Sequence, residues 1–191
     1  MFFTLPTLLT WARIVAIPLV IGIFYLPVDL RSANLWATLL FIVVAATDWL
    51  DGYLARRLNQ TSSFGAFLDP VADKLLVTAA LLVLLQLDRV NALVALIIIG
   101  REITISALRE WMAQIGASRS VAVHMLGKLK TTAQLAAIPF LLYDGLLFGV
   151  IDTRWWGTVA ILVASVLTVW SMLYYLQRAW PILRAGGGTK L

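Results

Sequence analysis

Long apolar runs separated by short polar segments dominate this chain. Pro, Gly, Asn and charged residues fall between the runs, and this pattern predicts membrane-spanning helices. The fold class is therefore all-α, a polytopic integral membrane protein with six transmembrane helices. A short N-terminal interfacial helix over residues 1–9 is a further candidate, and Trp36, Trp155 and Trp156 fall at span ends as interfacial anchors. The helices are expected near residues 8–26, 35–58, 68–87, 91–114, 128–148 and 155–178.

Composition agrees with a bilayer environment. The chain is 61% hydrophobic and only 13% charged, and its mean hydropathy is +0.91, values that exclude an ordinary soluble domain. At about 20 residues per crossing, 191 residues leave room for six spans and short loops. We therefore expect one domain over residues 1–191 with a flexible tail over about 185–191, membrane lipids as partners and no nucleic acid. The chain has no cysteine, which excludes disulfides and thiolate metal sites.

The distribution of charge predicts the orientation. If the helices alternate in direction, all fifteen Lys and Arg residues except Arg31, Arg89 and Arg154 fall on one side of the membrane. The positive-inside rule makes that side cytoplasmic and places both termini there. Several apolar runs reach full length only by including charged residues, which must then face a polar cavity. The sequence thus predicts a water-filled site at the cytoplasmic end.

Four aspartates carry the candidate chemistry of that site. Asp48 and Asp51 are three residues apart, and Asp69 and Asp73 are four apart, so each pair shares one face of a helix. Carboxylates gathered near hydrocarbon repel each other unless they are paired or bind cations, and an all-oxygen ligand set favours Mg²⁺ or Mn²⁺. The alternative is that they are helix caps, and Asp69 before Pro70 has the spacing of an N-cap.

Small residues accompany the aspartates. Gly52 and Ala55 lie about one helical turn from the first pair, where they let a ligand approach the helix backbone closely. Gly65 precedes the second pair and can relax the turn that brings the second helix back. Together these positions complete the string D-x-x-D-G-x-x-A-R-x8-G-x3-D-x3-D, which ends at Asp73.

This string resembles the signature of the CDP-alcohol phosphotransferase family. Four further stretches, near residues 5–13, 100–102, 106–111 and 127–131, resemble a bacterial member of the family. The resemblance covers about residues 4–178 and thins over about 142–154. It implies a homodimer in the bacterial cytoplasmic (inner) membrane, with the active site on the cytoplasmic face.

The resemblance also implies a reaction and its residues. CDP-diacylglycerol is the expected phosphatidyl donor, CMP the leaving group, and two divalent ions, Mg²⁺ or Mn²⁺, the cofactors. By family analogy Asp73 is the general base for the acceptor hydroxyl. The implied metal ligands are Asp48, Asp51, Asp69 and Asp73, and the implied nucleotide contacts are Asp51, Gly52, Ala55, Arg56 and Gly65.

Basic residues beside the expected cavity indicate the acceptor. They suit a phosphorylated alcohol, and glycerol 3-phosphate fits, which would make the product phosphatidylglycerophosphate. Arg101 is the strongest candidate because it interrupts an apolar helix next to Glu102. The acceptor-phosphate candidates are Arg101, Arg119 and Lys128, with Thr10, Arg13, Arg109 and Lys130 as further candidates for the cavity.

Three other functions remain open at this point. Another acceptor, such as serine or inositol phosphate, would suit the same family. A cation transporter could also use six helices and buried carboxylates, although it leaves Gly52, Ala55 and Gly65 unexplained. A prenyl-diphosphate enzyme shares paired aspartates and Mg²⁺ but gives no purpose to Gly52, Ala55 and Arg56.

Overall fold

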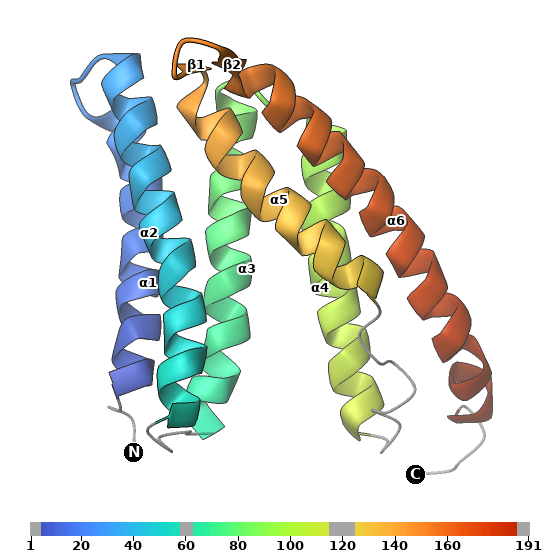
Figure 1. Ribbon diagram of the computed structural model, residues 1–191. Coiled ribbons are helices and arrows are strands. Elements are labelled where there is room, and N and C mark those ends of the chain that lie inside the picture. The colour runs from blue at the N-terminus through green and yellow to red at the C-terminus, as the bar shows by residue number, and fades with distance from the viewer. Residues whose placement is uncertain (1–4, 58–62, 115–124, 187–191) are drawn as a thin grey trace. The chain divides into compact units, whose positions relative to one another are not determined.

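The structure, a computed structural model, describes residues 5–57, 63–114 and 125–186; within the helices, the side chains of several residues, among them 48–56 and 125–131, lie outside the described part. Figure 1 shows the order of the elements along the chain. They are α1 (Leu5–Gly22), the short 3-10 helix η1 (Ile23–Tyr25), α2 (Leu30–Arg57), α3 (Ser63–Gln86), α4 (Ala92–Gln114), α5 (Met125–Tyr143), strands β1 (Leu146–Leu147) and β2 (Ile151–Asp152), and α6 (Thr153–Gly186).

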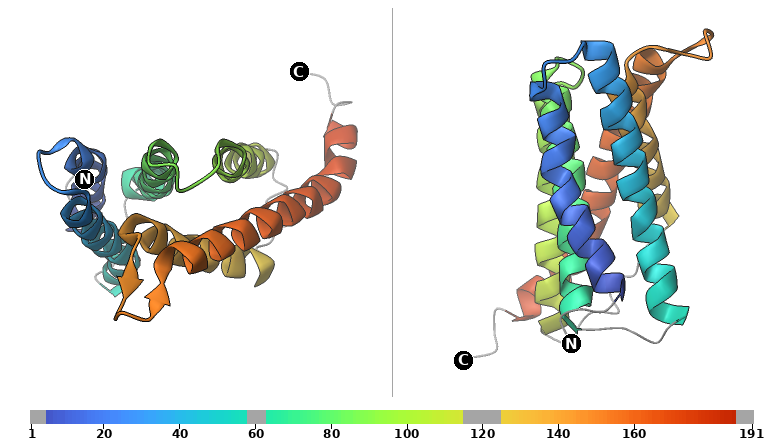
Figure 2. Two further views of the ribbon diagram at one scale, coloured as in Figure 1. Left: turned by 90° about the horizontal axis from the view of Figure 1, so that it is seen from above. Right: turned by 90° about the vertical axis from the view of Figure 1, so that its left-hand side faces the viewer.

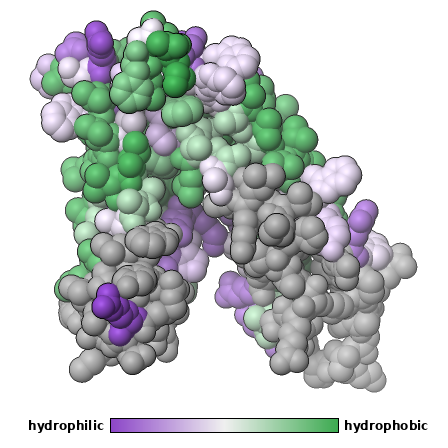
Figure 3. Space-filling model, in the orientation of Figure 1, coloured by the Kyte–Doolittle hydropathy of each residue, from purple (hydrophilic) through white to green (hydrophobic). Residues whose placement is uncertain are grey.

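The described residues thus form the six α-helices that the sequence predicts. Among them, three stretches are long and apolar enough to cross a membrane by length and composition: Thr7–Tyr25, Leu30–Thr47 and Thr153–Tyr174. Many large apolar side chains on these helices are exposed, and Figure 3 shows broad apolar areas among the coloured residues. Such a surface suits lipid rather than water. A crossing by α3, α4 and α5 as well stays a prediction.

The chain divides into two compact units. The first comprises Met1–Val90 and Ile138–Thr158, and the second comprises Asn91–Ala137 and Val159–Leu191. In the first unit α1 packs against both α2 and α3 (Figure 2). Small residues such as Ala37, Ala72 and Ala80 are buried there and allow helices to approach closely. In the second unit Ile105 and Met112 of α4 form a buried cluster with Met172 of α6.

Asp and Asn side chains cap the beginnings of α2, α4 and α6. The Ser32 amide donates to Asp29 Oδ2 (2.9 Å) at the start of α2, and the Leu93 amide donates to Asn91 Oδ1 (2.8 Å) at the start of α4. Asp152 Oδ1 accepts from the amides of Arg154 (3.0 Å) and Trp155 (3.2 Å) before α6. These side chains satisfy amides that have no partner inside the helix.

The segment after α5 corrects the sequence prediction. The helix expected to reach residue 148 ends at Tyr143, and residues 146–152 form an antiparallel hairpin in which Leu146 pairs with Asp152 and Leu147 with Ile151. Asp144 ends the helix because its φ of 47° is left-handed. A short apolar run is compatible with either a helix end or a strand, so hydrophobicity alone predicted the wrong structure here.

Several other boundaries differ from the prediction, and α2, for example, begins at Leu30 rather than near 35. Residues 5–9 belong to α1, so they do not form a separate interfacial helix, and residues 1–4 lie outside the described part. Helix α3 begins at Ser63 rather than near 68. Helix α6 continues past residue 178 to Gly186, into the segment expected to be a flexible tail. One domain over residues 1–191 remains a prediction.

Helices α5 and α6 touch at Gly157. A Cβ placed on Gly157 would lie 2.7 Å from Leu141 Cγ and 3.1 Å from the Leu141 backbone nitrogen. Real Cβ contacts are not this short, so only glycine fits at this crossing. Both residues belong to the first unit, where this contact fixes the beginning of α6 against the end of α5.

Candidate active site

Asp69 and Asp73 lie inside one continuous helix. Because α3 begins at Ser63, Asp69 is in the helix interior and does not act as its N-cap, which removes the capping alternative for this residue. For the same reason Gly65 lies in the first turn of α3 and not in the preceding turn. The ring of Trp11 on α1 lies 6.4 Å from that of Phe64, so the start of α3 is held against α1.

A buried arginine from α1 joins the two carboxylates. Arg13 Nη1 lies 2.6 Å from Asp73 Oδ1 and 3.3 Å from Asp69 Oδ1. The Arg13 side chain is fully buried, whereas those of Asp69 and Asp73 are 39% and 46% exposed. Thr10, one turn earlier, is also buried. The carboxylates are therefore fixed from the protein side by a charge-assisted hydrogen bond and remain partly exposed.

This arrangement fits a divalent cation. Two carboxylates separated by one helical turn share a partly exposed face, and carboxylate oxygens are the ligands that Mg²⁺ and Mn²⁺ prefer. Among the residues with described side chains, no group of three or more Asp, Glu, His or Cys forms. Asp48, Asp51, Gly52, Ala55 and Arg56 lie near the end of α2, but their side chains are outside the described part, so the four-carboxylate site stays a prediction.

Arg101 lies on α4 in the second unit and is buried. Its Nη1 donates to Glu102 Oε1 at 2.9 Å, so Glu102 is the neutralising neighbour that the sequence indicated. Within the described part of the chain, Arg101 Nε is buried without a hydrogen-bond partner. A buried guanidinium donor that is not fully paired is costly, and binding of an anion would satisfy it.

The other acceptor candidates are less well described. Arg109 lies on α4, and Lys128 and Lys130 lie on α5, but their side chains are outside the described part. Arg119 lies outside the described residues altogether. Their expected role in binding the acceptor phosphate stays a prediction.

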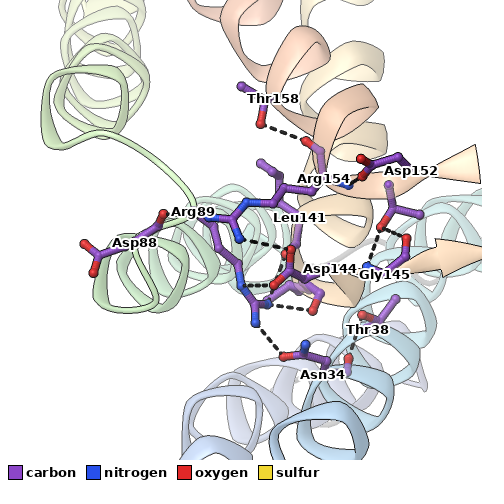
Figure 4. A network of polar contacts seen from close by, with 12 residues as sticks. Asn34, Thr38, Asp88, Arg89, Leu141, Asp144, Gly145, Asp152, Arg154 and Thr158 are labelled. Carbon is purple, nitrogen blue, oxygen red and sulfur yellow. Dashed lines mark hydrogen bonds and ion pairs between the residues drawn. The ribbon is translucent and has the colours of Figure 1, made fainter.

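Another buried arginine of the first unit forms a cluster that sequence analysis missed (Figure 4). Arg89 follows α3, and its Nη1 donates to the carbonyls of Leu141 (3.1 Å) and Leu142 (2.8 Å) at the end of α5. Its Nη2 donates to Asn34 Oδ1 (2.9 Å) on α2, and its Nε lies 3.2 Å from Asp144 Oδ2. Burial lowers the pKa of the Arg89 guanidinium, and Asp144 opposes this shift. An arginine keeps its charge despite such a shift, and its contacts hold three helix ends together.

Both clusters, the one around Arg13 and the one around Arg89, are signalled in the sequence by an arginine that the expected topology places in or next to apolar surroundings. Arg13 interrupts an apolar helix and Arg89 stands on the side of the membrane that is poor in basic residues. Such residues need a buried acceptor. The sequence signals that a partner is needed, but the partners, Asp73 for Arg13 and Asp144 for Arg89, are sixty and fifty-five residues away along the chain.

Comparisons with known proteins identify the family of this chain. A family model described as CDP-alcohol phosphatidyltransferase matches residues 3–170. Relatives from Escherichia coli (strain K12), Shigella flexneri serotype 5b (strain 8401) and Shigella sonnei (strain Ss046) are each 49% identical over 181 residues, covering 94% of this chain and 96% of the relative. Each of these relatives is named CDP-diacylglycerol–glycerol-3-phosphate 3-phosphatidyltransferase. With its complete aspartate motif and a match over most of its length, this multi-pass membrane protein belongs to the CDP-alcohol phosphatidyltransferase family.

Proposed function

We propose that this protein is a phosphatidylglycerophosphate synthase. It transfers the phosphatidyl group of CDP-diacylglycerol to glycerol 3-phosphate and releases CMP. The relatives named for this reaction match nearly the whole chain. The structural observation that supports it best is the meeting of Asp69 and Asp73 at the buried guanidinium of Arg13, within a motif whose four aspartates are all present.

Binding is assigned to the following residues. Asp48, Asp51, Asp69 and Asp73 hold divalent metal, Mg²⁺ or Mn²⁺, which when bound neutralises charge on the diphosphate. Asp51, Gly52, Ala55, Arg56 and Gly65 bind the nucleotide, with the small residues permitting close approach. Arg101, Arg119 and Lys128 bind the acceptor phosphate, and Arg101 offers the buried Nε donor for it.

The chemical step needs one proton transfer and one substitution at phosphorus. Asp73 takes the proton from the acceptor hydroxyl, whose oxygen forms a bond to the β-phosphorus of CDP-diacylglycerol as the bond to CMP breaks. Arg13 fixes the rotamer of Asp73 through the 2.6 Å contact and so acts as a positioning residue. The partial exposure of Asp73 leaves room for the acceptor beside it.

The proposed orientation places both termini and the aspartates in the cytoplasm, in a bacterial inner membrane. Of the three basic residues on the opposite side, Arg89 and Arg154 both lie within 4 Å of Asp144. The proposed assembly is a homodimer.

An acceptor panel tests the activity. Purified protein in liposomes receives CDP-diacylglycerol, Mg²⁺ or Mn²⁺, and one radiolabelled acceptor: glycerol 3-phosphate, serine or inositol phosphate. We expect labelled lipid and CMP in equal amounts with glycerol 3-phosphate, and neither product when one substrate is omitted. Preferential turnover of another acceptor would assign the protein a different acceptor specificity within its family. Cation flux without CMP release would identify a transporter instead.

A further inference from the structure

The hairpin tip, residues 146–151, is the most exposed apolar segment among the described residues. Phe148 is 88% exposed and Val150 is 84% exposed, more than any other large apolar side chain in the described part of the chain. The seven residues from Gly145 to Ile151 carry no charge. Within the first unit, the hairpin projects outward beyond the helices in both views of Figure 2. Such a tip is unfavourable in water and needs an apolar partner.

The backbone conformation of the turn is unusual for a phenylalanine. Phe148 has a φ of 54° and Gly149 a φ of 74°, and the Val150 amide donates to the Leu147 carbonyl at 3.2 Å. Two left-handed residues inside such a turn are typical of type I′, where Asn or Asp followed by Gly is preferred. A bulky residue at positive φ costs free energy. Phe148 therefore carries a backbone cost that Asn or Asp would largely avoid at this position.

The surrounding contacts hold the hairpin in this orientation. Thr153 Oγ1 donates to the Gly145 carbonyl (2.8 Å) and accepts from the Gly145 amide (3.0 Å), so the base of the hairpin is closed. Both flanking carboxylates are engaged on the protein side: Asp144 pairs with Arg89, and Asp152 caps α6. The charges are thus kept away from the tip, and the tip presents only apolar side chains.

The position of the hairpin in the chain identifies its partner. It directly joins the apolar stretch Thr132–Tyr143 to the membrane-span candidate Thr153–Tyr174. Trp155 and Trp156 follow at the start of α6, exposed and packed edge to face with centroids 4.8 Å apart, as is typical of an interfacial aromatic belt. A connection this short stays at the membrane boundary. Along the chain the tip is followed by α6, whose exposed apolar side chains include Val159, Leu162 and Val166.

We infer that the hairpin tip inserts into the bilayer and anchors the protein in the leaflet opposite the aspartates. Within the first unit, α3 separates the two ends, since Asp73 and Gln86 lie about 20 Å apart at 1.5 Å per residue. The tip supplies apolar contact with acyl chains, and Trp155 and Trp156 fix its depth at the headgroups. This inference rests on the membrane-spanning helices and does not depend on the proposed reaction.

Site-directed spin labelling tests the anchor, because the chain has no native cysteine. A nitroxide is attached to Val150→Cys in phosphatidylethanolamine and phosphatidylglycerol liposomes, and its collisions with O₂ and with a water-soluble nickel chelate are compared. Val166→Cys serves as the lipid reference and Arg31→Cys as the polar reference. We expect the ratio of O₂ collisions to nickel-chelate collisions at the Val150 label to equal that at the Val166 label. This ratio should be severalfold higher than at the Arg31 label. Preference for the nickel chelate would overturn the inference.

Two further measurements separate the remaining outcomes. Dipolar broadening that disappears on dilution with unlabelled protein would show that a second copy covers the tip, and it would also overturn the inference. Phe148→Asn suits the left-handed turn but removes the apolar side chain, so we expect its melting temperature in detergent to be equal or higher and its Val150 label to move toward water. Phe148→Leu keeps both the strain and the apolar character and should leave the label depth unchanged.

Discussion

The first unit contains two buried arginines that contact aspartates, and their surroundings differ. Arg89 contacts Asp144, which is 19% exposed, the buried Asn34 and two backbone carbonyls. Arg13 contacts Asp69 and Asp73, which are 39% and 46% exposed. A guanidinium surrounded by acceptors of low exposure holds structure together, whereas carboxylates that stay partly exposed beside a buried guanidinium have a surface that a ligand can reach. Exposure of the carboxylates, rather than burial of the arginine, distinguishes a candidate site from a structural cluster.

Substitution of one aspartate beside each buried arginine with Asn tests this distinction most strongly. Asp73→Asn removes the proposed base, and we expect kcat to fall by roughly 10²–10⁴-fold. Asp144→Asn is the matched control, because it also removes a carboxylate from a buried arginine. It should lower stability while leaving kcat per folded molecule near wild type. Equal loss of turnover in the two variants would show that both ends serve the reaction equally.

Substitution of Arg89 should mainly affect stability. Arg89→Met removes the main partner of Asp144, which is only 19% exposed, and the hydrogen bonds to the end of α5, so we expect a loss of about 3–5 kcal/mol in unfolding free energy. Thermal and denaturant unfolding in detergent measure the change. Arg154→Gln is the control, since Arg154 is exposed and 3.7 Å from Asp144, and it should cost at most about 1 kcal/mol. Similar losses in both variants would contradict the assignment of Arg89 as the centre of this cluster.

Arg101 extends the comparison to a third buried arginine, in the second unit. Its unpaired Nε predicts that Arg101→Ala raises KM for glycerol 3-phosphate by roughly 10- to 100-fold, the worth of a charge-assisted hydrogen bond. KM for CDP-diacylglycerol should change much less. Steady-state kinetics with each substrate varied in turn measure both values. An equal rise in the two would indicate a structural role for Arg101.

Removal of the charge at Arg13 should produce a smaller and distinctive effect. Arg13→Gln keeps a hydrogen-bond donor but removes the positive charge beside Asp69 and Asp73. We therefore expect bound Mn²⁺ to raise the melting temperature more in this variant than in wild type, although kcat falls roughly tenfold through misplacement of Asp73. Arg13→Lys keeps the charge and should retain the wild-type thermal shift. An equal rise in melting temperature on adding Mn²⁺ in all three proteins would show that the charge of Arg13 does not influence the metal site.

Asp29 gives the smallest expected effect. Hydrogen bonds from Ser32 lower the pKa of this exposed cap below 3.8. A lowered folded-state pKa means that its contribution to stability is present above about pH 3.8 and is lost as the pH falls through the folded-state value. The difference in melting temperature between wild type and Asp29→Ala should therefore shrink on acidification below that pH. A difference that is independent of pH would show that the carboxylate charge does not matter to the cap.

The sequence predicts most of the helices and much of the site because both follow from local rules. Apolar runs and charges located the six helices, and the spacing of Asp69 and Asp73 placed two carboxylates on one face of α3. The hairpin was missed because Leu146, Leu147 and Val150 are as apolar as the residues at the end of a membrane helix. Only Asp144 and Gly149 indicate in the sequence that the helical backbone ends there. The partners of Arg13 and Arg89 could not be predicted, because they depend on packing between helices distant in sequence.

The contact at Gly157 has a consequence for lipid traffic. Backbone and side chain of the neighbouring helix meet there so tightly that even a methyl group is excluded. An acyl chain cannot slip between α5 and α6 at this level. An acyl chain that approaches the proposed aspartate site must therefore enter elsewhere than between α5 and α6 at this crossing.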